Sequence, residues 1–332
     1  MLAILCMTGT QNGIAQLNYD RIYKYAGSGT SGPGVNPSGG LAVDKEGNVC
    51  MGENSRIVKI DAITGLTSVV AGTGVPGFSG DWGLATAAQI NGVLDITIDL
   101  KTNDLYFVDQ YVAGGPGGLG SGSRIRKISS GFIMPVAGTG TIGHSGDGGS
   151  AAGANISARA ITMTPDGKLL IAEPFYIRKV ESSSPIINTI AGSGASPYTI
   201  SGSGGHALSA NLDLGEGQIE CDAYGNIYIS ETPWNTIRKI DPVSYGIAMY
   251  AGIPSATRGA LGAYSGDGGR ATDAQLFNPL DFVFDSFGNM YVGDSYNFVV
   301  RKVTPGVGGA ISTVAGNNVN TIAMLPDACG HP

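Results

Sequence analysis

A chain of 332 residues with 42% hydrophobic and only 14% charged residues can build a core, which excludes charge-driven disorder. Its 54 glycines favour short strands joined by many tight turns, because such turns often need a backbone with positive φ. The net charge of −7 argues against a nucleic-acid partner, since phosphate binding leaves a basic footprint on a protein.

The first predicted element is a secretory signal peptide over residues 1–16. This stretch, MLAILCMTGTQNGIAQ, combines a short apolar run with a small-x-small ending at Gly13-Ile14-Ala15. It has no basic start, and a buried first strand is the alternative. No later apolar run is long enough to span a bilayer. We therefore expect an extracytoplasmic protein that is secreted, periplasmic or at the cell surface.

Residues 17–332 are expected to form one repeat domain, because a block of short β-type runs recurs five times. The blocks begin with GGLAVDKEGN at residue 39, DITIDLKTND at 95, AITMTPDGK at 160, GQIECDAYGN at 217 and DFVFDSFGN at 281. Each block reads as four runs of β-branched or aromatic residues. The first two runs are joined by Gly-Asn or a close substitute, which is a strong hairpin signal.

An Ala-Gly step follows the blocks at a regular period. The steps recur roughly every 45 to 66 residues, a period typical of propeller blades. They are Ala26-Gly27, Ala71-Gly72, Ala137-Gly138, Ala191-Gly192, Ala251-Gly252 and Ala315-Gly316. A four-stranded antiparallel unit cannot bury both of its faces alone, whereas radial stacking of such units buries them. The sequence therefore predicts an all-β fold, a β-propeller of four-stranded antiparallel blades.

Six blades are expected, five of them complete and the sixth shared by the two chain ends. The step at Ala26 has no block before it, and the C-terminal TIAMLPDACG aligns with the start of a block. A blade started by the C-terminus and completed by the N-terminus would remove a free sheet edge. The C-terminal piece is short for three strands, so a truncated chain or an abbreviated sixth blade stays open.

One glycine motif has two interpretations. Gly72–Gly77 satisfies G-x-G-x-x-G, the phosphate-binding pattern of dinucleotide enzymes. A second copy stands at Gly138–Gly143, and neither copy opens a helical pattern within a βαβ unit. We therefore interpret these glycines as the exit from one blade toward the next.

The recurring run AGTGxxGFSGDGGxAxxAxL resembles the secreted form of the NHL-repeat β-propeller family, over nearly the whole chain from about residue 20. Enzymes similar to this family include peptide-amidating lyases and, on a related propeller, streptogramin lyases. These enzymes resemble one another in placing histidines around a central metal or base. The chain has only His144, His206 and His331, and no such histidine set maps onto them.

The loops between blocks share a Ser-Gly-Asp-Gly-Gly run and an Ala-x-x-Ala turn. The run holds one aspartate in three copies, Asp81, Asp147 and Asp267, and Ser203 stands in the remaining copy. This exchange favours capping of backbone N–H groups over a calcium site, which needs several carboxylate ligands. The small residues of the second motif predict a tight turn packed closely between neighbouring blades.

Four loop residues are candidates for contact with a ligand. Phe78, His144 and Tyr264 share one position of the loop, where they either form an exposed face or cover the Ala-x-x-Ala turn. Covering the turn is the favoured interpretation. Trp82 is the strongest candidate for an exposed contact, because the other three loops carry glycine at its position.

An acidic residue closes the second run of every block. The five residues are Glu53, Asp109, Glu173, Glu231 and Asp294. A lysine follows in each third run, with an arginine before it in four blocks. Such carboxylates could bind a cation or a sugar, or form a lactonase-type metal site, but their regularity is typical of a group that every blade needs. We therefore interpret them as a structural acidic ring.

These features predict a non-catalytic binding or scaffold propeller that uses no cofactor and whose partner is a protein or a glycan. The alternative is a metal-dependent lyase or hydrolase with a divalent metal in the central channel. A nucleic-acid-binding propeller is a third possibility, opposed by the acidic charge balance and by the predicted signal peptide. No motif indicates an oligomeric state.

Overall fold

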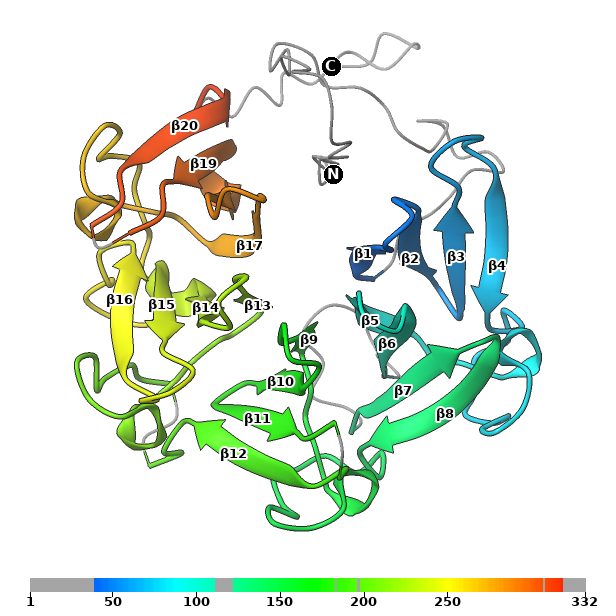
Figure 1. The fold of residues 1–332 in the computed structure, drawn as a ribbon. Helices are drawn as coiled ribbons and strands as arrows, with labels where there is room; N and C mark the ends of the chain where they lie inside the picture. Colours follow the sequence, from blue (N-terminus) through cyan, green and yellow to red (C-terminus); the bar gives the residue numbers. More distant parts are fainter. Residues whose placement is uncertain (1–38, 111–121, 183, 196–197, 307, 319–332) are drawn as a thin grey trace, which may run out of the picture. The chain divides into compact units, whose positions relative to one another are not determined.

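The computed structural model describes residues 39–110, 122–182, 184–195, 198–306 and 308–318. These residues form an all-β propeller fold with five four-stranded antiparallel sheets as its blades (Figure 1). Blade 1 contains β1 (Leu41–Val43), β2 (Val49–Glu53), β3 (Arg56–Ile60) and β4 (Thr67–Ala71). Blade 2 contains β5 (Val93–Asp99), β6 (Asp104–Asp109), β7 (Arg124–Ser129) and β8 (Phe132–Ala137).

The remaining three blades repeat this order of strands. Blade 3 contains β9 (Ala160–Met163), β10 (Leu169–Glu173), β11 (Tyr176–Val180) and β12 (Ile187–Ala191). Blade 4 contains β13 (Ile219–Cys221), β14 (Ile227–Glu231), β15 (Thr236–Ile240) and β16 (Ile247–Ala251). Blade 5 contains β17 (Pro279–Phe284), β18 (Met290–Asp294), β19 (Val299–Val303) and β20 (Ile311–Gly316).

The prediction of six blades is wrong, because the structure contains five in the part of the chain that it describes. An Ala-Gly step marks the end of one outer strand, whereas a blade requires four hydrogen-bonded strands. Counting six steps therefore overcounted the blades. The two segments assigned to the sixth blade, around Ala26 and at residues 321–330, lie outside the described residues, as does the predicted signal peptide at 1–16.

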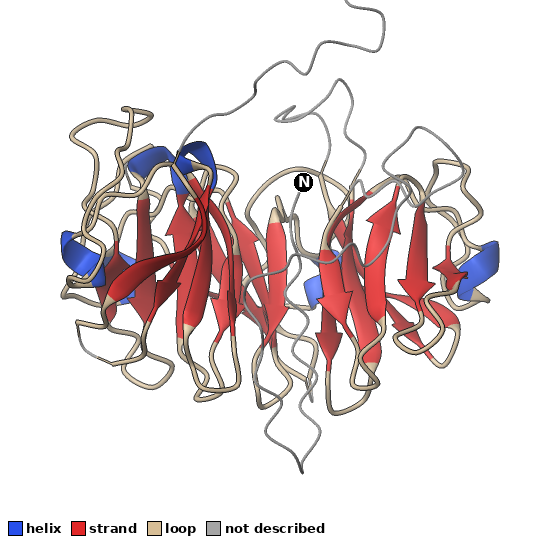
Figure 2. Cartoon of the chain, turned by 90° about the horizontal axis from the view of Figure 1, so that it is seen from above, coloured by secondary structure: helices blue, strands red, loops and turns tan. Residues whose placement is uncertain are grey.

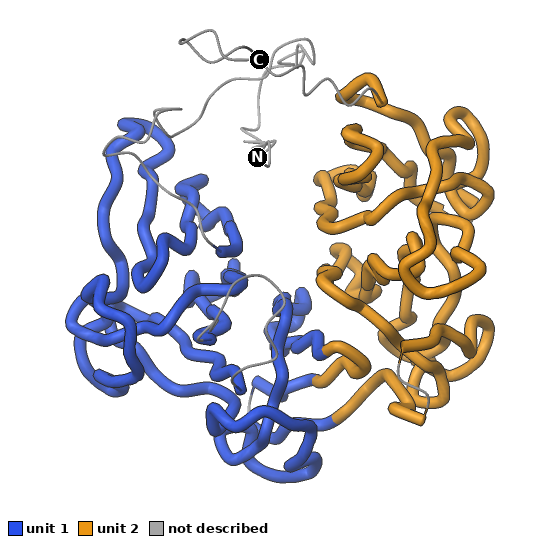
Figure 3. Tube along the Cα trace, turned by 180° about the vertical axis from the view of Figure 1, so that it is seen from behind, with its two compact units in different colours: residues 1–173, 179–188 blue, residues 174–178, 189–332 orange. Residues whose placement is uncertain are grey.

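The chain divides into two compact units (Figure 3). Unit 1 comprises residues 1–173 and 179–188, and unit 2 comprises residues 174–178 and 189–332. Blades 1 and 2 belong to unit 1, and blades 4 and 5 belong to unit 2, so the boundary passes through the strands of blade 3.

The first hairpin of a blade is built from an aspartate and an asparagine around a glycine. Asp222 accepts hydrogen bonds from the backbone N–H of Asn226 at 2.9 Å and from its side-chain amide at 2.7 Å. Gly225 between them has a φ of 81°, a conformation that glycine adopts without strain. Asp44 and Asp285 make the same pair of bonds in blades 1 and 5. The Gly-Asn pattern in the sequence thus corresponds to a turn that is closed by hydrogen bonds to an aspartate side chain.

The G-x-G-x-x-G motif lies at the exit from blade 1. Gly72 has a φ of 88°, and a Cβ atom on it would stand 2.3 Å from the carbonyl oxygen of Ser55. The next helix is η1 (Ala85–Ala87), a single 3-10 turn of three residues. The motif therefore serves a close backbone approach at the end of β4, and no dinucleotide-type helix follows it.

The Ala-x-x-Ala turns pack between adjacent blades, as their small residues predict. Ala85, Ala88 and Ile90 are fully buried in one cluster with Ile57 of blade 1 and Phe107 of blade 2. The turns η2 (Ala151–Gly153), η3 (Ala207–Ser209) and η5 (Ala271–Asp273) repeat the arrangement of η1 at the later loops. Full burial of one isoleucine or leucine contributes about 1.5–3 kcal/mol, so each turn helps to join its neighbouring blades.

The helices of the described residues are short 3-10 turns in the connections between strands (Figure 2). Besides the four interblade turns, η4 (Thr232–Trp234) and η6 (Ser295–Asn297) follow the second strands of blades 4 and 5. Within the described ranges, no helix has the length and apolar character that crossing a bilayer requires.

Candidate functional site

A buried arginine accompanies each interblade loop that continues into an Ala-x-x-Ala turn. The four arginines occupy the same position of the third strand in blades 2 to 5 and are fully buried: Arg126, Arg178, Arg238 and Arg301. Blade 1 has Val58 at that position, and the sequence before blade 1 contains no Ala-x-x-Ala pattern. The arginine and the loop therefore occur together, which indicates that the arginine holds the loop.

In blade 2 the arginine is shared by two carboxylates. Arg126 makes ion pairs with Asp81 of the loop at 2.6 Å and with Asp109 at the end of β6 at 3.1 Å. It also donates to the carbonyl oxygens of Ser79 and Gln89, at 2.9 and 2.8 Å. Burial raises the pKa of Asp109, although the backbone N–H of Asn91 and the guanidinium oppose this shift. Both ends of the loop are thus fixed to one guanidinium.

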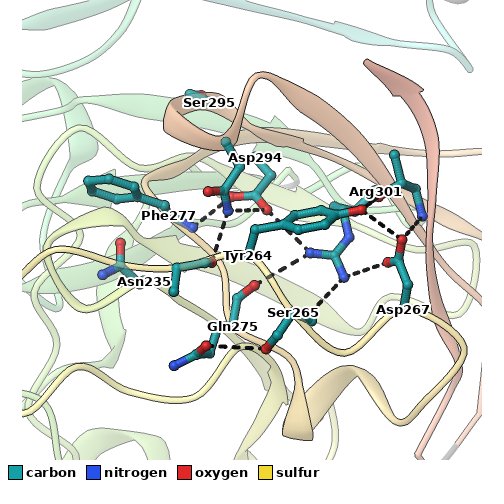
Figure 4. A network of polar contacts seen from close by, with 12 residues as sticks. Asn235, Tyr264, Ser265, Asp267, Gln275, Phe277, Asp294, Ser295 and Arg301 are labelled. Atoms are coloured by element: carbon teal, nitrogen blue, oxygen red, sulfur yellow. Dashed lines mark hydrogen bonds and ion pairs between the residues drawn. The ribbon is translucent and has the colours of Figure 1, made fainter. Parts of the chain in front are cut away.

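Blade 5 repeats this arrangement (Figure 4). The guanidinium of Arg301 lies between Asp267 of the loop, at 2.7 Å, and Asp294 at the end of β18, at 3.4 Å. The ring of Tyr264 lies beside it, with its centroid 4.8 Å from the guanidinium carbon. Asp294 also accepts a hydrogen bond of 2.6 Å from the backbone N–H of Phe277, where the loop ends.

In blade 4, a single carboxylate compensates the charge of the buried arginine. Glu231 at the end of β14 accepts two hydrogen bonds from Arg238, both of 2.6 Å. Ser203 stands in the loop where blades 2 and 5 have aspartate. Burial raises the pKa of Glu231, and Arg238 opposes that shift. Glu231 thus binds the Nε–Nη2 edge of the guanidinium, the edge that Asp81 binds in blade 2, and Nη1 of Arg238 donates to the carbonyl oxygen of Ser201.

The two remaining members of the predicted acidic ring differ from these three. Glu173 at the end of β10 is buried and lies 2.7 Å from Nδ1 of His144, and its other oxygen accepts a 3.4 Å hydrogen bond from the backbone N–H of Ser157. Glu53 ends β2 in the blade that has Val58 in place of the arginine, and it is partly buried. In blades 2 to 5, the carboxylate that ends the second strand binds the last turn of the preceding loop.

The four predicted contact residues fall into two groups. Phe78 lies 3.7 Å from the guanidinium carbon of Arg124 and 4.9 Å from that of Arg126. Tyr264 stacks on Arg301, and His144 bonds to Glu173, so these three side chains contact the charged groups that fix the loops. Trp82 is different, because its side chain is 71% exposed.

Trp82 also has an unusual backbone. Its φ is 68°, in the left-handed region, whereas the equivalent Gly148, Gly204 and Gly268 have φ of 79°, 91° and 82°. A non-glycine residue in this region carries a cost of about 1–3 kcal/mol. An exposed tryptophan is thus retained at a backbone position where glycine is the unstrained residue.

The structure also reveals a cluster of residues that occurs in only one copy of the repeat. We name Phe175, Tyr198, Asp213, Trp234 and Arg258, all in unit 2, the aromatic–arginine cluster. Asp213 accepts hydrogen bonds from Nε of Arg258 at 2.6 Å and from the indole N–H of Trp234 at 3.1 Å. The guanidinium carbon of Arg258 lies 4.8 Å from the ring centroid of Tyr198, which meets Phe175 edge to face at 5.1 Å.

Burial in this cluster is graded from the carboxylate outward. Asp213 is 1% exposed, the side chain of Arg258 is 42% exposed, and Tyr198 is 53% exposed. Tyr198 has a φ of 65°, so it is a second exposed aromatic residue in the left-handed region. A buried acid therefore holds a cation, and the cation lies against an exposed ring.

Sequence reasoning missed this cluster because it followed what the repeats share. The signal lay in the departures from the repeat. The loops that contain Tyr198 and Arg258 are longer than the first two by two and six residues, counted from the Ala-Gly step to the Ser-Gly run. Asp213 stands where the other loops have Asn91, Ser157 or Phe277.

No metal-binding constellation is present in the part of the chain that the structure describes. Groups of three or more His, Cys, Asp or Glu side chains arranged to hold an ion do not occur there. The arginine-bound carboxylates of blades 2, 4 and 5 have cationic partners already, so a second cation would compete with a guanidinium for them.

No family model matches the chain. Teneurin-1 from Gallus gallus is 28% identical over 263 residues, which cover 71% of this chain and 9% of teneurin-1. The chain thus spans about a tenth of the length of this curated relative.

Two solved structures from Bacteroides thetaiotaomicron resemble the chain. A protein of unknown function has a TM-score of 0.55 at 15% identity, covering 88% of this chain and 60% of that one. An auxiliary nutrient binding protein has a TM-score of 0.53 at 14% identity, covering 83% of this chain and 56% of that one. At such low identity these likenesses show the fold alone, and the fold that they share with this chain is the β-propeller.

Proposed function

We propose that the protein is a non-catalytic, extracytoplasmic binding propeller of the NHL type, and that its ligand is a glycan. One observation carries the proposal. Trp82 and Tyr198 are more than half exposed aromatic residues in interblade loops, and both have a left-handed backbone. Strained residues of this kind often cluster at ligand contacts, where the surrounding structure holds them in place.

The remainder of the repeat supplies a rigid support for these residues. Buried guanidiniums fix the loops, and the interblade turns are packed into the core. Contact residues carried by loops on a rigid scaffold are a common arrangement for binding. The likeness in fold to an auxiliary nutrient binding protein agrees with a binding role, and aromatic rings suit the apolar faces of sugars.

Binding to an array of soluble and insoluble polysaccharides tests this function on the full chain. We expect retention on at least one glycan, weakened by Trp82→Ala or Tyr198→Gly without a loss of folded protein. Capture of a protein by a site that includes neither residue, with no glycan bound, would contradict the proposal. The proposal includes no metal, so a stoichiometric divalent ion found by elemental analysis would instead favour a metal-dependent lyase or hydrolase.

A further inference from the structure

We infer that the aromatic–arginine cluster of unit 2 is a binding site for a neutral pyranose unit of a glycan. The inference rests on the proposed function and adds to it the place of binding and the chemical class of the ligand. Three properties of the cluster carry it: an exposed ring, an oriented set of N–H donors, and a charge that is already compensated.

The exposed ring belongs to Tyr198. Its edge-to-face contact with Phe175, at 5.1 Å between centroids, restrains the ring, while 53% of the residue remains open to solvent. A pyranose has an apolar face of C–H groups, and an aromatic ring that is held in place can cover such a face at a small cost in conformational entropy.

The oriented donors belong to Arg258. Its Nε donates to Asp213 at 2.6 Å, and its Nη2 lies 3.5 Å from the other oxygen of that carboxylate. Among the described residues, Nη1 donates no hydrogen bond, and the guanidinium lies against the Tyr198 ring. Donors beside a ring can bind the hydroxyl oxygens at the rim of a sugar whose face stacks on that ring.

The site is connected to the loop anchor of blade 4, by which we mean the ion pair of Arg238 with Glu231 that fixes the loop before this blade. The backbone N–H of Asp213 donates to Glu231 at 3.0 Å, and Glu231 is the carboxylate that holds Arg238. The indole N–H of Trp234 donates to Oδ2 of Asp213, the same oxygen that accepts from Nε of Arg258. Arg258 is therefore oriented before any ligand arrives, which reduces the ordering that binding requires.

The charge of the site favours a neutral sugar over an acidic one. Asp213 compensates the guanidinium of Arg258, and the exposed Glu216 follows it by three residues on the same turn. A uronic acid would bring a further carboxylate toward these two acids, and like charges repel at short range. Neutral hydroxyl groups do not meet that repulsion.

Isothermal titration of the full chain with oligosaccharides tests the site. The probes are neutral hexaoses derived from glucan, mannan and galactan, with an oligogalacturonide as the acidic probe. We expect one neutral hexaose to bind, with an affinity at least about tenfold weaker in Tyr198→Gly and in Arg258→Met. Glycine is chosen at position 198 because the φ of 65° suits it, and thermal unfolding should be little changed.

A matched control separates this site from exposed tyrosines in general. Tyr224 is 87% exposed at a hairpin tip of blade 4, also in unit 2, and Tyr224→Ala should leave the affinity unchanged. Asp213→Asn should weaken binding less than Arg258→Met, because it keeps the guanidinium and loosens only its orientation.

The possible outcomes distinguish failure of this site from failure of the proposed glycan-binding function. Equal affinities of wild type, Tyr198→Gly and Arg258→Met for a neutral hexaose would overturn this site and leave the glycan-binding function standing. Preferential binding of the oligogalacturonide, sensitive to Arg258→Met, would overturn the ligand class. If the wild-type chain binds no glycan of any kind, the proposed function fails together with the site.

Discussion

The loop anchors of blade 2 and blade 4 solve one problem with different residues. In blade 2, Arg126 is shared between Asp81 of the loop and Asp109 of the strand. In blade 4, Glu231 is the single carboxylate on Arg238 and binds its Nε and Nη2, and the loop carries Ser203. The difference shows that an interblade loop of this kind depends on a compensated guanidinium rather than on an aspartate within the loop.

Blade 1 has no such loop before it, and the position of the arginine is taken by Val58, which is 5% exposed. A buried ion pair is weak evidence for stability, since an apolar residue of similar volume is often equally stable. The arginines of blades 2, 4 and 5 are explained by their bonds to loop carbonyl oxygens, such as those of Ser201 and Asn211 in blade 4. Their role is to fix loop conformation.

The largest expected effect comes from removing the arginine in blade 4. Arg238→Met leaves Glu231 buried without a counterion and leaves two carbonyl oxygens of the loop without their donor. We expect the free energy of unfolding at neutral pH to fall by about 3–5 kcal/mol, measured by urea denaturation. The neighbouring Lys239→Met should cost well under about 1 kcal/mol. Similar losses in both variants would show that Arg238 is not an anchor.

The same variant should respond to pH in a predictable direction. Burial already raises the pKa of Glu231, and without Arg238 nothing comparable opposes that shift. A carboxyl whose pKa is higher in the folded state favours folding below its unfolded pKa, and this contribution is lost as pH rises through the folded pKa. Arg238→Met should therefore approach wild-type stability as pH falls from neutrality toward 4.5, the ordinary pKa of a glutamate side chain. A deficit that stays constant across that range contradicts the assignment.

An intermediate effect should follow from exchanging the two solutions. Asp81→Ser removes one carboxylate from Arg126 and should cost about 1.5–3 kcal/mol, the range for hydrogen bonds to charged groups. Adding Asp109→Glu gives blade 2 the residues of blade 4 and should recover part of that loss. A double-mutant cycle measured by urea denaturation reports the coupling. Strictly additive losses would mean that the two blades are not interchangeable.

The smallest expected effect on stability comes from substitution of Trp82, in the interblade loop before blade 2. At a φ of 68°, Trp82→Gly should relieve strain and leave stability equal to or above that of wild type. Trp82→Ala keeps the strain of an L-residue, so it should be less stable than Trp82→Gly by about 1–2 kcal/mol. Differential scanning calorimetry of the two variants measures this gap, and a glycine variant less stable than the alanine variant would remove the strain argument.

Much of the fold could be predicted because its signals are local. The Gly-Asn hairpins, the glycines after each fourth strand and the Ala-x-x-Ala turns each depend on a few adjacent residues, and the structure contains all three. The number of blades was predicted wrongly, because Ala26 marks the end of a strand and the sequence around it does not contain the other strands that a blade needs.

The candidate site was predicted less well. Trp82 was recognised as a departure from glycine, and the structure places it on the surface with a strained backbone. The sequence leaves Phe78 and Tyr264 open between an exposed face and a cover for the turn, and in the structure both rings lie against arginines. Which cation would meet each strand-end carboxylate was also left open between a lysine and an arginine. Alternation along the strand decides this, because adjacent residues point to opposite faces of a sheet.

The repeat, the four-stranded blade, the glycine turns between blades and the chemistry of the loops follow from local sequence, because hydrophobic alternation and glycine requirements act over short stretches. The aromatic–arginine cluster, in contrast, exists only through contacts of the folded chain, which bring together Phe175, Tyr198, Asp213, Trp234 and Arg258. Asp213 and Arg258 lie 45 residues apart in the chain. Their contact depends on how two loops and the end of a strand meet, and no spacing rule in a sequence encodes such a meeting.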